Sequence, residues 1–277
     1  MDEITTEEAA ALVEFRERID DMLVLEEDTS DAAKQRVELA KSYCASDAMM
    51  LRYLMAKTGK NNTYKLDISE KQFRDSIFWK VDEEVADVMM EWERSDMITN
   101  FSQKPKTEMA ERGEKVFYAG IYGRTKAGGL LMVERTGLAD GAGVSGNDEA
   151  KMAVRKCYIH YLENIWRHNL EKNSRGRNVL VLDLADLSMS SLRYVSLANA
   201  MITMSTSYWP ELTCKIYVIN AGWSFQAIFA AVSPFLPERT KNKVSVLGSE
   251  YTETLAGLLV GGIDQVRFYT ISLHLYH

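Results

Sequence analysis

Several short groups of residues in this chain have types and spacings that could support chemistry. Residues 141–146 read Gly-Ala-Gly-Val-Ser-Gly, which fits the Gly-x-Gly-x-x-Gly pattern of dinucleotide-binding loops. Such a site also needs an acidic residue about 20 residues further on, at the end of the next strand. The strand-end carboxylate here, Asp183, is much too distant, and Asp140 would oppose a phosphate. A glycine loop without a nucleotide is the better interpretation.

The acidic, histidine and serine residues form no metal or nucleophile motif. Asp183 and Asp186 follow an apolar run, where ligands of α/β folds often bind, but no histidine or third carboxylate lies nearby in sequence. Loop capping is therefore the favoured role for both. Ser249 lacks the Gly-x-Ser-x-Gly elbow of a hydrolase. The histidines lack metal-ligand spacing: His160, His168, His274 and His277. We expect no enzyme, no metal and no cofactor.

The composition narrows the function classes further. The chain has 277 residues, of which 46% are hydrophobic and 26% charged, as in ordinary globular proteins. A net charge of −7 argues against nucleic-acid binding. Cys44, Cys157 and Cys214 are scattered without Cys-x-x-Cys spacing, which predicts free thiols in a reducing, cytoplasmic compartment. The start of the chain does not read as a signal peptide.

Residues 1–95 predict a bundle of four helices. Thr5 and Glu8 form a capping box, and apolar residues then repeat at three and four positions. Asp31 and Asp47 are expected to cap two further helices, and Ser69 with Gln72 a fourth. The apolar stripes expected in the core include Leu12, Phe15, Ile19 and Met22, and then Phe73, Ile77, Val81, Val85 and Trp92.

The pattern changes to alternating strands and helices after Lys115. This alternation indicates an α/β fold with a largely parallel sheet, and a domain boundary is plausible only near 95–109. Helices are expected over 148–170, over 190–207 and after Trp223. The predicted strands are 116–122, 130–134, 179–183, 215–220 and 243–248.

One uncharged stretch, Val218–Pro237, has the length of a membrane span. Polar residues and two prolines interrupt it, so a transmembrane helix is not expected. From periodicity alone, the helix inside this stretch is typical of an ordinary buried helix.

Five blocks over residues 179–248 occur in a distinctive order and spacing. They read Val179-Leu-Val-Leu-Asp-Leu-Ala-Asp-Leu-Ser188, Ser207-Tyr-Trp-Pro-Glu211, Lys215-Ile-Tyr-Val-Ile-Asn-Ala-Gly-Trp-Ser-Phe225, Pro234-Phe-Leu236 and Thr240-Lys-Asn-Lys-Val-Ser-Val-Leu-Gly248. Further forward stand Leu51-Arg-Tyr-Leu-Met-Ala-Lys57, Trp79-Lys80 and the segment 123–134. Together these residues resemble the CRAL-TRIO family, in its branch of phosphatidylinositol-transfer proteins.

The resemblance implies a helical N-terminal lobe over 1–95 and a CRAL-TRIO lipid-binding domain over 110–265. It implies that the sheet forms the floor of an apolar pocket for one lipid, with Ile121, Met132, Leu180 and Leu182 in the pocket wall. It also implies a mobile gate helix starting near Ser224, whose apolar face carries Phe225, Ile228, Phe229 and Val232. The family commonly has proline and glycine where this chain has Gly222 and Ser224, so Gly222 is the expected hinge.

The resemblance also implies a phosphatidylinositol headgroup site. Thr240 and Lys243 match a threonine and a lysine that the branch uses for this lipid. Lys57 occupies a family arginine position, which keeps the charge but loses bidentate geometry. Thr58 replaces the lysine that usually pairs with the residue at Glu211. Without the resemblance, Arg239, Lys241 and Lys243 read as a solvated surface run.

The residues that the family uses for phosphatidylcholine are missing. Asn178 and Leu180 replace a serine and a threonine, and Ile121 and Met132 replace two tyrosines. The second ligand is therefore expected to be a sterol, an isoprenoid or another diacyl lipid.

Two function classes stay open. The first is a protein that exchanges or presents phosphatidylinositol and a second hydrophobic ligand at membrane surfaces that it contacts transiently. The alternative is a regulatory module that binds a protein partner, such as a small GTPase, around a structural lipid.

Overall fold

The computed structural model describes residues 4–24, 30–58, 63–92, 106–114, 117, 119–136, 144, 147–172, 175, 178–185, 187, 189–248 and 251–262. The chain divides into two compact units. The first comprises residues 1–89, 162–175 and 204–212, and the second comprises 90–161, 176–203 and 213–277. The division falls within α8 (Asp148–Glu171) and α9 (Val195–Tyr208), and it separates the last residue of α5 (Val85–Met90) from the rest of that helix.

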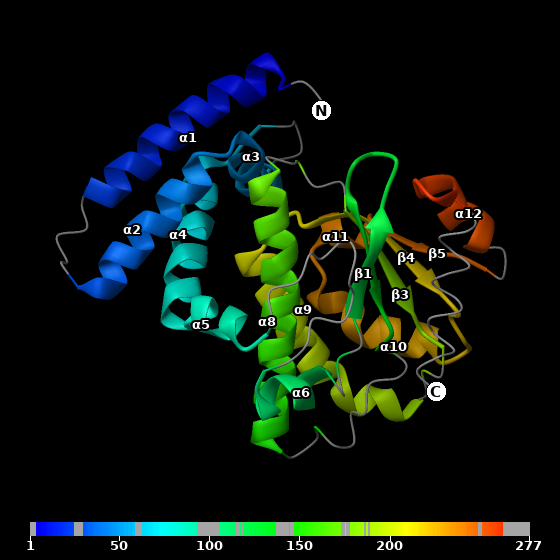
Figure 1. Ribbon diagram of the computed structural model, residues 1–277. Helices are drawn as coiled ribbons and strands as arrows, with labels where there is room; N and C mark the ends of the chain where they lie inside the picture. Colours follow the sequence, from blue (N-terminus) through cyan, green and yellow to red (C-terminus); the bar gives the residue numbers. More distant parts are fainter. Residues whose placement is uncertain are drawn as a thin grey trace. The chain divides into compact units, whose positions relative to one another are not determined.

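The N-terminal region is helical, as predicted, but it contains one more helix than expected (Figure 1). The long apolar stripe that starts at Phe73 does not lie on a single helix. Glu84 adopts a left-handed conformation with φ of 51°, which ends one helix and starts another. The helices are α1 (Thr6–Val24), α2 (Asp31–Cys44), α3 (Asp47–Ala56), α4 (Leu66–Asp82) and α5 (Val85–Met90).

The capping box at the start of α1 is confirmed. The Thr5 backbone N–H donates to Glu8 Oε2 at 3.0 Å, and the Glu8 N–H donates to Thr5 Oγ1 at 3.2 Å. The next two caps were each predicted one residue too late. Ser30 and Ser46, rather than the aspartates that follow them, accept the N–H groups at the starts of α2 and α3. A serine one residue earlier satisfies the same orphan donors.

The predicted capping box at Ser69 and Gln72 is wrong, because α4 begins three residues earlier at Leu66. Both side chains instead connect helices inside the first unit. Ser69 Oγ donates to the Tyr53 carbonyl, and Gln72 Nε2 donates to the carbonyls of Thr206 and Ser207.

A buried ion pair lies in the core of the first unit. Lys80 on α4 and Glu163 on α8 are 2% and 3% exposed, and Lys80 Nζ lies 2.9 Å from Glu163 Oε2. Trp209 Nε1 donates to the same oxygen at 2.8 Å. The pKa of Lys80 is lowered to about 8 by burial, against the opposing effect of the carboxylate. Lysine remains mostly charged at neutral pH, so the pair is ionic.

The second unit contains the sheet, and its predicted strands are confirmed with small shifts in their ends. The strands are β1 (Ala119–Arg124), β2 (Leu130–Glu134), β3 (Asn178–Asp183), β4 (Thr213–Ile219) and β5 (Val244–Val246), in the order β1-β2-β3-β4-β5. Only the β1–β2 pair is antiparallel among these strands. The fold is therefore α/β with a largely parallel sheet.

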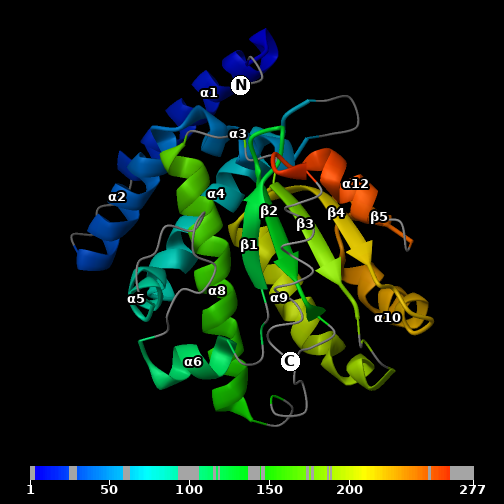
Figure 2. The same cartoon turned by 45° about the vertical axis from the view of Figure 1, so that its right-hand side comes forward.

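The two faces of the sheet are packed differently. One face presents Leu131, Val133, Val179 and Val181 to Leu255 and Leu259, so α12 (Tyr251–Leu258) covers it. Figure 2 shows α12 in front of the strands and α10 (Phe225–Val232) behind them. Within the second unit, α12 and α10 therefore lie on opposite sides of the sheet.

The other short elements are α6 (Glu108–Glu114), η2 (Met189–Tyr194), η3 (Ser233–Phe235) and α11 (Glu238–Lys241). The helix expected over 190–207 begins as a turn of 3₁₀ helix, η2, and continues as α9. Sequence patterns did not predict α6 or α12, because both are short and weakly periodic.

Removing the buried cation is expected to destabilise the first unit strongly. Lys80→Met should lower the free energy of unfolding by up to about 3–5 kcal/mol, because the buried Glu163 carboxylate then keeps only the more exposed Arg167 as a counter-ion. Urea denaturation followed by circular dichroism measures this loss. Lys71→Met is the matched control, since Lys71 pairs with Asp75 on the surface and such pairs contribute little. A similar, small loss in both variants would contradict the role of the ion pair.

Candidate functional site

The four residues predicted to form a pocket wall share one face of the sheet. Ile121 pairs with Met132, and Met132 pairs with Leu180. Residues directly opposite in neighbouring strands point to the same side, and Leu182, two positions along β3, shares that side. We call this the inner face; it is opposite to the face that α12 covers.

The inner face is incompletely packed at the middle strand. Both faces of a central strand in a parallel sheet are normally buried. Ile121 and Met132 are buried, but Leu180 and Leu182 on β3, and Ile216 beside them on β4, each keep part of their surface accessible. The sequence predicted apolar residues here, and the structure adds that protein atoms do not fully cover them.

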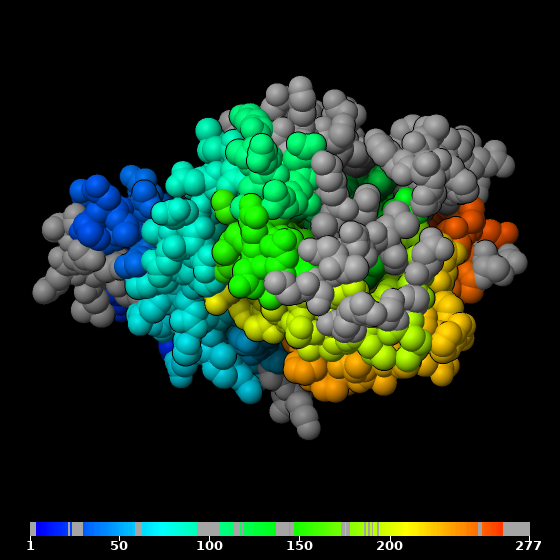
Figure 3. All heavy atoms as spheres, turned by 90° about the horizontal axis from the view of Figure 1, so that it is seen from below, coloured from blue at the N-terminus to red at the C-terminus, as the bar shows by residue number. Residues whose placement is uncertain are grey.

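The uncharged helix α10 has no buried residue along its length. Its predicted apolar face is half-buried, and the rings of Phe225 and Phe229 stack with their centroids 5.4 Å apart. Ala227 and Ala230 are exposed. Figure 3 shows the atoms of α10 next to those of η2 and the start of α9. The expectation of an ordinary buried helix is therefore wrong. The half-buried residues are Phe225, Ile228, Phe229 and Val232.

Two exposed aromatic residues flank α10 and were not singled out from the sequence. Trp223 is 83% exposed and Phe235 is 53% exposed. Contiguous apolar patches mark surfaces that contact other molecules or membranes, and these two side chains lie just before and just after the apolar helix in sequence. The sequence could have indicated these two residues, because they lie at the two ends of an uncharged segment.

The loop before α10 is held at two points. Asn220 Nδ2 donates to Asp183 Oδ1 at 2.7 Å, and the same oxygen accepts the Ala185 N–H at 3.0 Å. Asp183 therefore caps a loop, as predicted; Asp186 lies outside the described residues. Ser224 Oγ donates to the Leu187 carbonyl at 2.8 Å.

Gly222 lies between these two points, and a Cβ there would meet no atom within 4 Å. The left-handed residue of this loop is Asn220, with φ of 53°. The structure thus gives no steric reason for glycine at 222, and the hinge remains a prediction.

Thr240 and Lys243 lie at a turn that leads into β5. Thr240 belongs to α11, and the Lys243 N–H donates to the Thr240 carbonyl at 3.0 Å. The Lys243 carbonyl accepts the N–H of Ile216 at 3.0 Å, so its backbone is fixed at the edge of the sheet. Both residues are partly exposed.

Lys57 and Glu211 belong to the first unit, whereas Thr240 and Lys243 belong to the second. Lys57 follows the last turn of α3 and is partly exposed. Glu211 has a left-handed backbone with φ of 53°, and its carbonyl accepts a hydrogen bond from the buried Arg52. Thr58 Oγ1 donates to the Met55 carbonyl and helps to end α3. The headgroup role of Lys57 and Glu211 stays a prediction.

A largely desolvated carboxyl group, which had not been singled out from the sequence, lies on the inner face. Glu134 ends β2 and pairs with Leu182, so its side chain lies on the same side of the sheet as the predicted pocket wall. Desolvation by burial raises its pKa from the ordinary 4.5 to about 7, and a weaker interaction with the Tyr161 hydroxyl opposes the rise. Although part of the Glu134 residue is accessible, its carboxyl group is surrounded mainly by protein atoms, and this desolvation raises its pKa.

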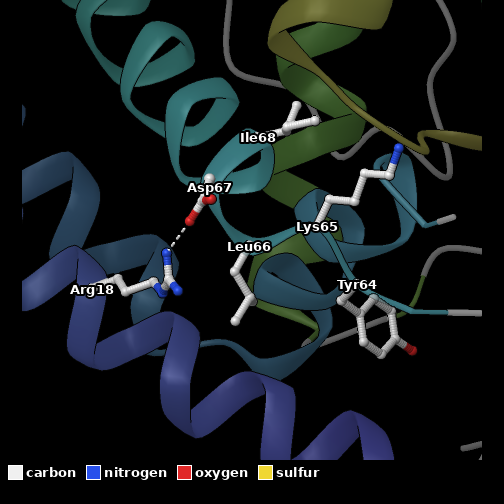
Figure 4. A pocket seen from close by; sticks show the side chains of 6 residues that line it. All are labelled: Arg18, Tyr64, Lys65, Leu66, Asp67 and Ile68. Carbon is white, nitrogen blue, oxygen red and sulfur yellow. Dashed lines mark hydrogen bonds and ion pairs between the residues drawn. The ribbon is translucent and has the colours of Figure 1, made fainter.

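A pocket of about 400 Å³ lies in the first unit, between α1 and the start of α4 (Figure 4). Arg18 and Asp67 form an ion pair at one side of it. None of the residues predicted for lipid binding lines this pocket. Its lining residues are Arg18, Tyr64, Lys65, Leu66, Asp67 and Ile68.

A model of the CRAL/TRIO domain family matches residues 114–259, more than half of the chain. The chain belongs to the CRAL/TRIO family. The matched CRAL/TRIO segment contains every strand of the described sheet, together with α8 to α12.

Several curated CRAL/TRIO relatives are about one quarter identical to the chain. The SEC14 cytosolic factor of Yarrowia lipolytica is 25% identical over 84% of this chain and 45% of its own length. The Sec14 cytosolic factor of Schizosaccharomyces pombe is 26% identical over 76% of this chain and 69% of its own length. A protein of Arabidopsis thaliana named phosphatidylinositol/phosphatidylcholine transfer protein SFH11 is 26% identical over 72% of this chain and 54% of its own length. The chain thus spans only part of each relative.

The crystal structure of Sfh5 has the same fold, with a TM-score of 0.55, 14% identity, and coverage of 93% of this chain and 85% of that one. Among the described residues, no helix is long and apolar enough to cross a membrane. The same residues contain no cluster of three or more His, Cys, Asp or Glu side chains that could hold a metal ion.

The buried carboxyl group is expected to make stability depend on pH. Because its pKa is higher in the folded protein, Glu134 loses its proton more readily when the chain unfolds. The protonated carboxyl contributes at most about 3 kcal/mol to the free energy of unfolding. This contribution is fully present below about pH 4.5 and is lost as the pH rises towards 7. Glu134→Gln should remove this loss, so the variant gains stability relative to the native chain between pH 5 and pH 7.

Melting temperatures of the two proteins from pH 5 to pH 8 measure this difference. Glu253→Gln on the exposed side of α12 is the control and should follow the native profile. Parallel profiles for the native chain and Glu134→Gln would contradict the burial of this carboxyl.

Proposed function

We propose that this CRAL/TRIO chain binds phosphatidylinositol and a second hydrophobic ligand, and exchanges or presents them at membrane surfaces. The observation that carries the proposal is the inner face of the sheet. Its apolar residues on β3 and β4 remain partly accessible in the middle of the sheet, where a parallel sheet is normally covered. Acyl chains or another apolar ligand would complete this packing. The names of the curated relatives support the same activity.

The uncharged helix α10 is the proposed gate between the inner face and the membrane. Its half-buried apolar residues and its exposed alanines tolerate both protein and hydrocarbon surroundings. Trp223 and Phe235 extend the apolar surface at its two ends. Tryptophan is enriched at membrane–water interfaces, where its amphipathic ring is stable. The contact is proposed to be transient and peripheral, made by a protein of the cytoplasm.

The inositol headgroup is proposed to meet Thr240 and Lys243. A phosphodiester carries one negative charge, and a lysine with a neighbouring hydroxyl supplies a charge-assisted contact and a neutral donor. The backbone hydrogen bond from Lys243 to Thr240 holds the two residues in one turn. Lys57 and Glu211 are proposed on the resemblance alone.

Phosphatidylcholine is not proposed as a ligand, although relatives are named for it. Leu180 on the inner face offers no hydroxyl group. Asn178 is fully buried, and its Oδ1 accepts the Leu130 N–H at 2.9 Å. The side-chain oxygen of Asn178 is therefore already used in a hydrogen bond to the backbone of β2.

The first test is a transfer assay between vesicles. Phosphatidylinositol in donor vesicles is expected to move to acceptor vesicles, whereas labelled phosphatidylcholine is expected to stay at the rate without protein. Radiolabelled lipids of both kinds, measured in the same reaction, give the comparison. Transfer of both lipids at similar rates would show that the interpretation of Asn178 and Leu180 is wrong.

Removing one cation should reduce phosphatidylinositol transfer specifically. Lys243→Ala is expected to lower transfer by about tenfold or more, because a charge-assisted hydrogen bond contributes about 1.5–3 kcal/mol. Lys241→Ala is the matched control: Lys241 lies two residues away and forms an ion pair with Glu238 at 3.7 Å. Equal transfer by the two variants would favour the solvated surface run instead.

A charge on α10 should block membrane contact. Phe229→Asp is expected to reduce vesicle association and transfer by about tenfold or more, since inserting a carboxylate into hydrocarbon costs several kcal/mol. Vesicle co-sedimentation and the transfer assay provide the two measurements.

Ala230→Asp tests the same idea at an exposed position, where folding should not suffer. Val13→Asp is the control, because Val13 is an exposed apolar residue that belongs to the first unit and not to α10. If Ala230→Asp transfers lipid at the native rate, and Phe229→Asp either does the same or fails to fold, the gate lies elsewhere.

A further inference from the structure

Glu134 introduces a polar group into an otherwise apolar part of the inner face. By register, it lies beside Leu182 on β3, and Leu182 lies beside Val218 on β4. The proposed phosphatidylinositol contacts do not use it, and no cation is among the groups that shift its pKa. A carboxyl group in such surroundings is costly unless it finds a hydrogen-bonding partner.

Tyr161 on α8 is the polar neighbour of Glu134 within the second unit. Its side chain is 8% exposed and packs edge-on against Phe117. The hydroxyl interacts with the Glu134 carboxyl, and it makes no hydrogen bond of standard geometry within the part of the chain that the structure describes. Two adjacent polar groups therefore keep unused hydrogen-bonding capacity next to the accessible inner face.

These two groups suit an uncharged hydroxyl better than a charged headgroup. A phosphate would meet a carboxyl group that is half ionised at neutral pH, and the two negative charges would repel. An ammonium group would have to lose its hydration in the same apolar surroundings. A hydroxyl both donates and accepts, so it can satisfy a carboxyl and a phenol together at a small cost of desolvation.

We infer, on the basis of the proposed lipid-binding function, that Glu134 and Tyr161 form a polar subsite that hydrogen-bonds the hydroxyl group of a lipid alcohol. The alcohol is the second hydrophobic ligand, and its apolar body lies against Leu180 and Leu182. A sterol, an isoprenoid alcohol and a diacylglycerol share this chemistry, and the experiment distinguishes them.

The test is a loading assay with the full chain. The protein is incubated with phosphatidylcholine vesicles that contain phosphatidylinositol and one alcohol: cholesterol, geranylgeraniol or dioleoylglycerol. Parallel vesicles contain the methyl ether of the same alcohol. The protein is then re-isolated, and its bound lipids are quantified by mass spectrometry. We expect at least one alcohol to load about tenfold more than its ether, because the ether can accept but not donate.

Three variants connect that preference to the two residues. Glu134→Leu and Tyr161→Phe should each reduce loading of the alcohol by about tenfold and leave loading of phosphatidylinositol within about twofold of native. Glu134→Gln should retain most of the loading, since an amide also donates and accepts. Circular dichroism confirms folding. Tyr161→Phe removes one oxygen atom without changing shape, so it decides the matter if Glu134→Leu fails to fold.

The outcomes separate this inference from the proposed function. Loading of phosphatidylinositol without any alcohol, or equal loading of alcohol and ether, overturns the subsite and leaves the proposed function intact. A selective loss of phosphatidylcholine in Glu134→Leu overturns it too, because the subsite would then bind a cation. Loading of an alcohol without phosphatidylinositol overturns only the proposed headgroup role of Thr240 and Lys243. Absence of any bound lipid overturns both.

Discussion

The buried carboxylate of Glu163 is the constraint on which the first unit depends. It accepts hydrogen bonds from Lys80 at 2.9 Å, Trp209 at 2.8 Å and Arg167 at 3.0 Å. These donors come from α4, from the turn after α9 and from α8 itself. Burial alone would raise the pKa of Glu163, but the two cations and the tryptophan lower it further than burial raises it.

The surroundings of Lys80 explain why a charge is tolerated there. Its ammonium group donates to the Tyr43 hydroxyl at 2.9 Å and lies within 5 Å of the ring centroids of Trp166 and Trp209. Cation–π contacts with desolvated rings add to the ion pair. A buried ion pair adds little net stability compared with apolar residues, but its geometry is specific. It therefore fixes how α4 packs on α8 within this unit.

The second unit depends on a different constraint, which is the two-residue period of its strands. Alternate residues of β2 and β3 serve opposite faces. Leu131, Val133, Val179 and Val181 pack with α12, so that face supplies the stability of the sheet. The alternate residues of β2 and β3 do not pack against α12, so the inner face that they form can stay partly open. A shift of one residue in register would exchange the two faces and expose the core.

Periodicity and turn signals predicted the strands and most helices, because buried residues dictate those patterns. The wrong predictions concern polar side chains that bind a partner distant in sequence instead of a neighbouring backbone group. At Ser69 the serine bonds to the Tyr53 carbonyl of another helix, which no local pattern shows. Glu134 was missed for a related reason: a glutamate at the end of a strand reads as a solvated residue until the sheet register places it beside Leu182. The predicted pocket wall came from resemblance, and the shared face of its four residues required the strand pairing.

The loop before α10 is tied to the rest of the second unit by a side-chain hydrogen bond near each of its ends. Asn220 is tied to the buried Asp183, so the chain leaves β4 in a fixed direction. Ser224, at the start of α10, makes a single side-chain hydrogen bond to the Leu187 carbonyl. Between these two points Gly222 has open space around its Cα. A rotation there would break the Ser224 bond and leave the Asp183 bond in place, and a single such bond contributes only about 1 kcal/mol. If α10 is the proposed gate and Gly222 its hinge, Ser224, which stands at the family's glycine position, would hold the helix by one weak hydrogen bond that opening has to break.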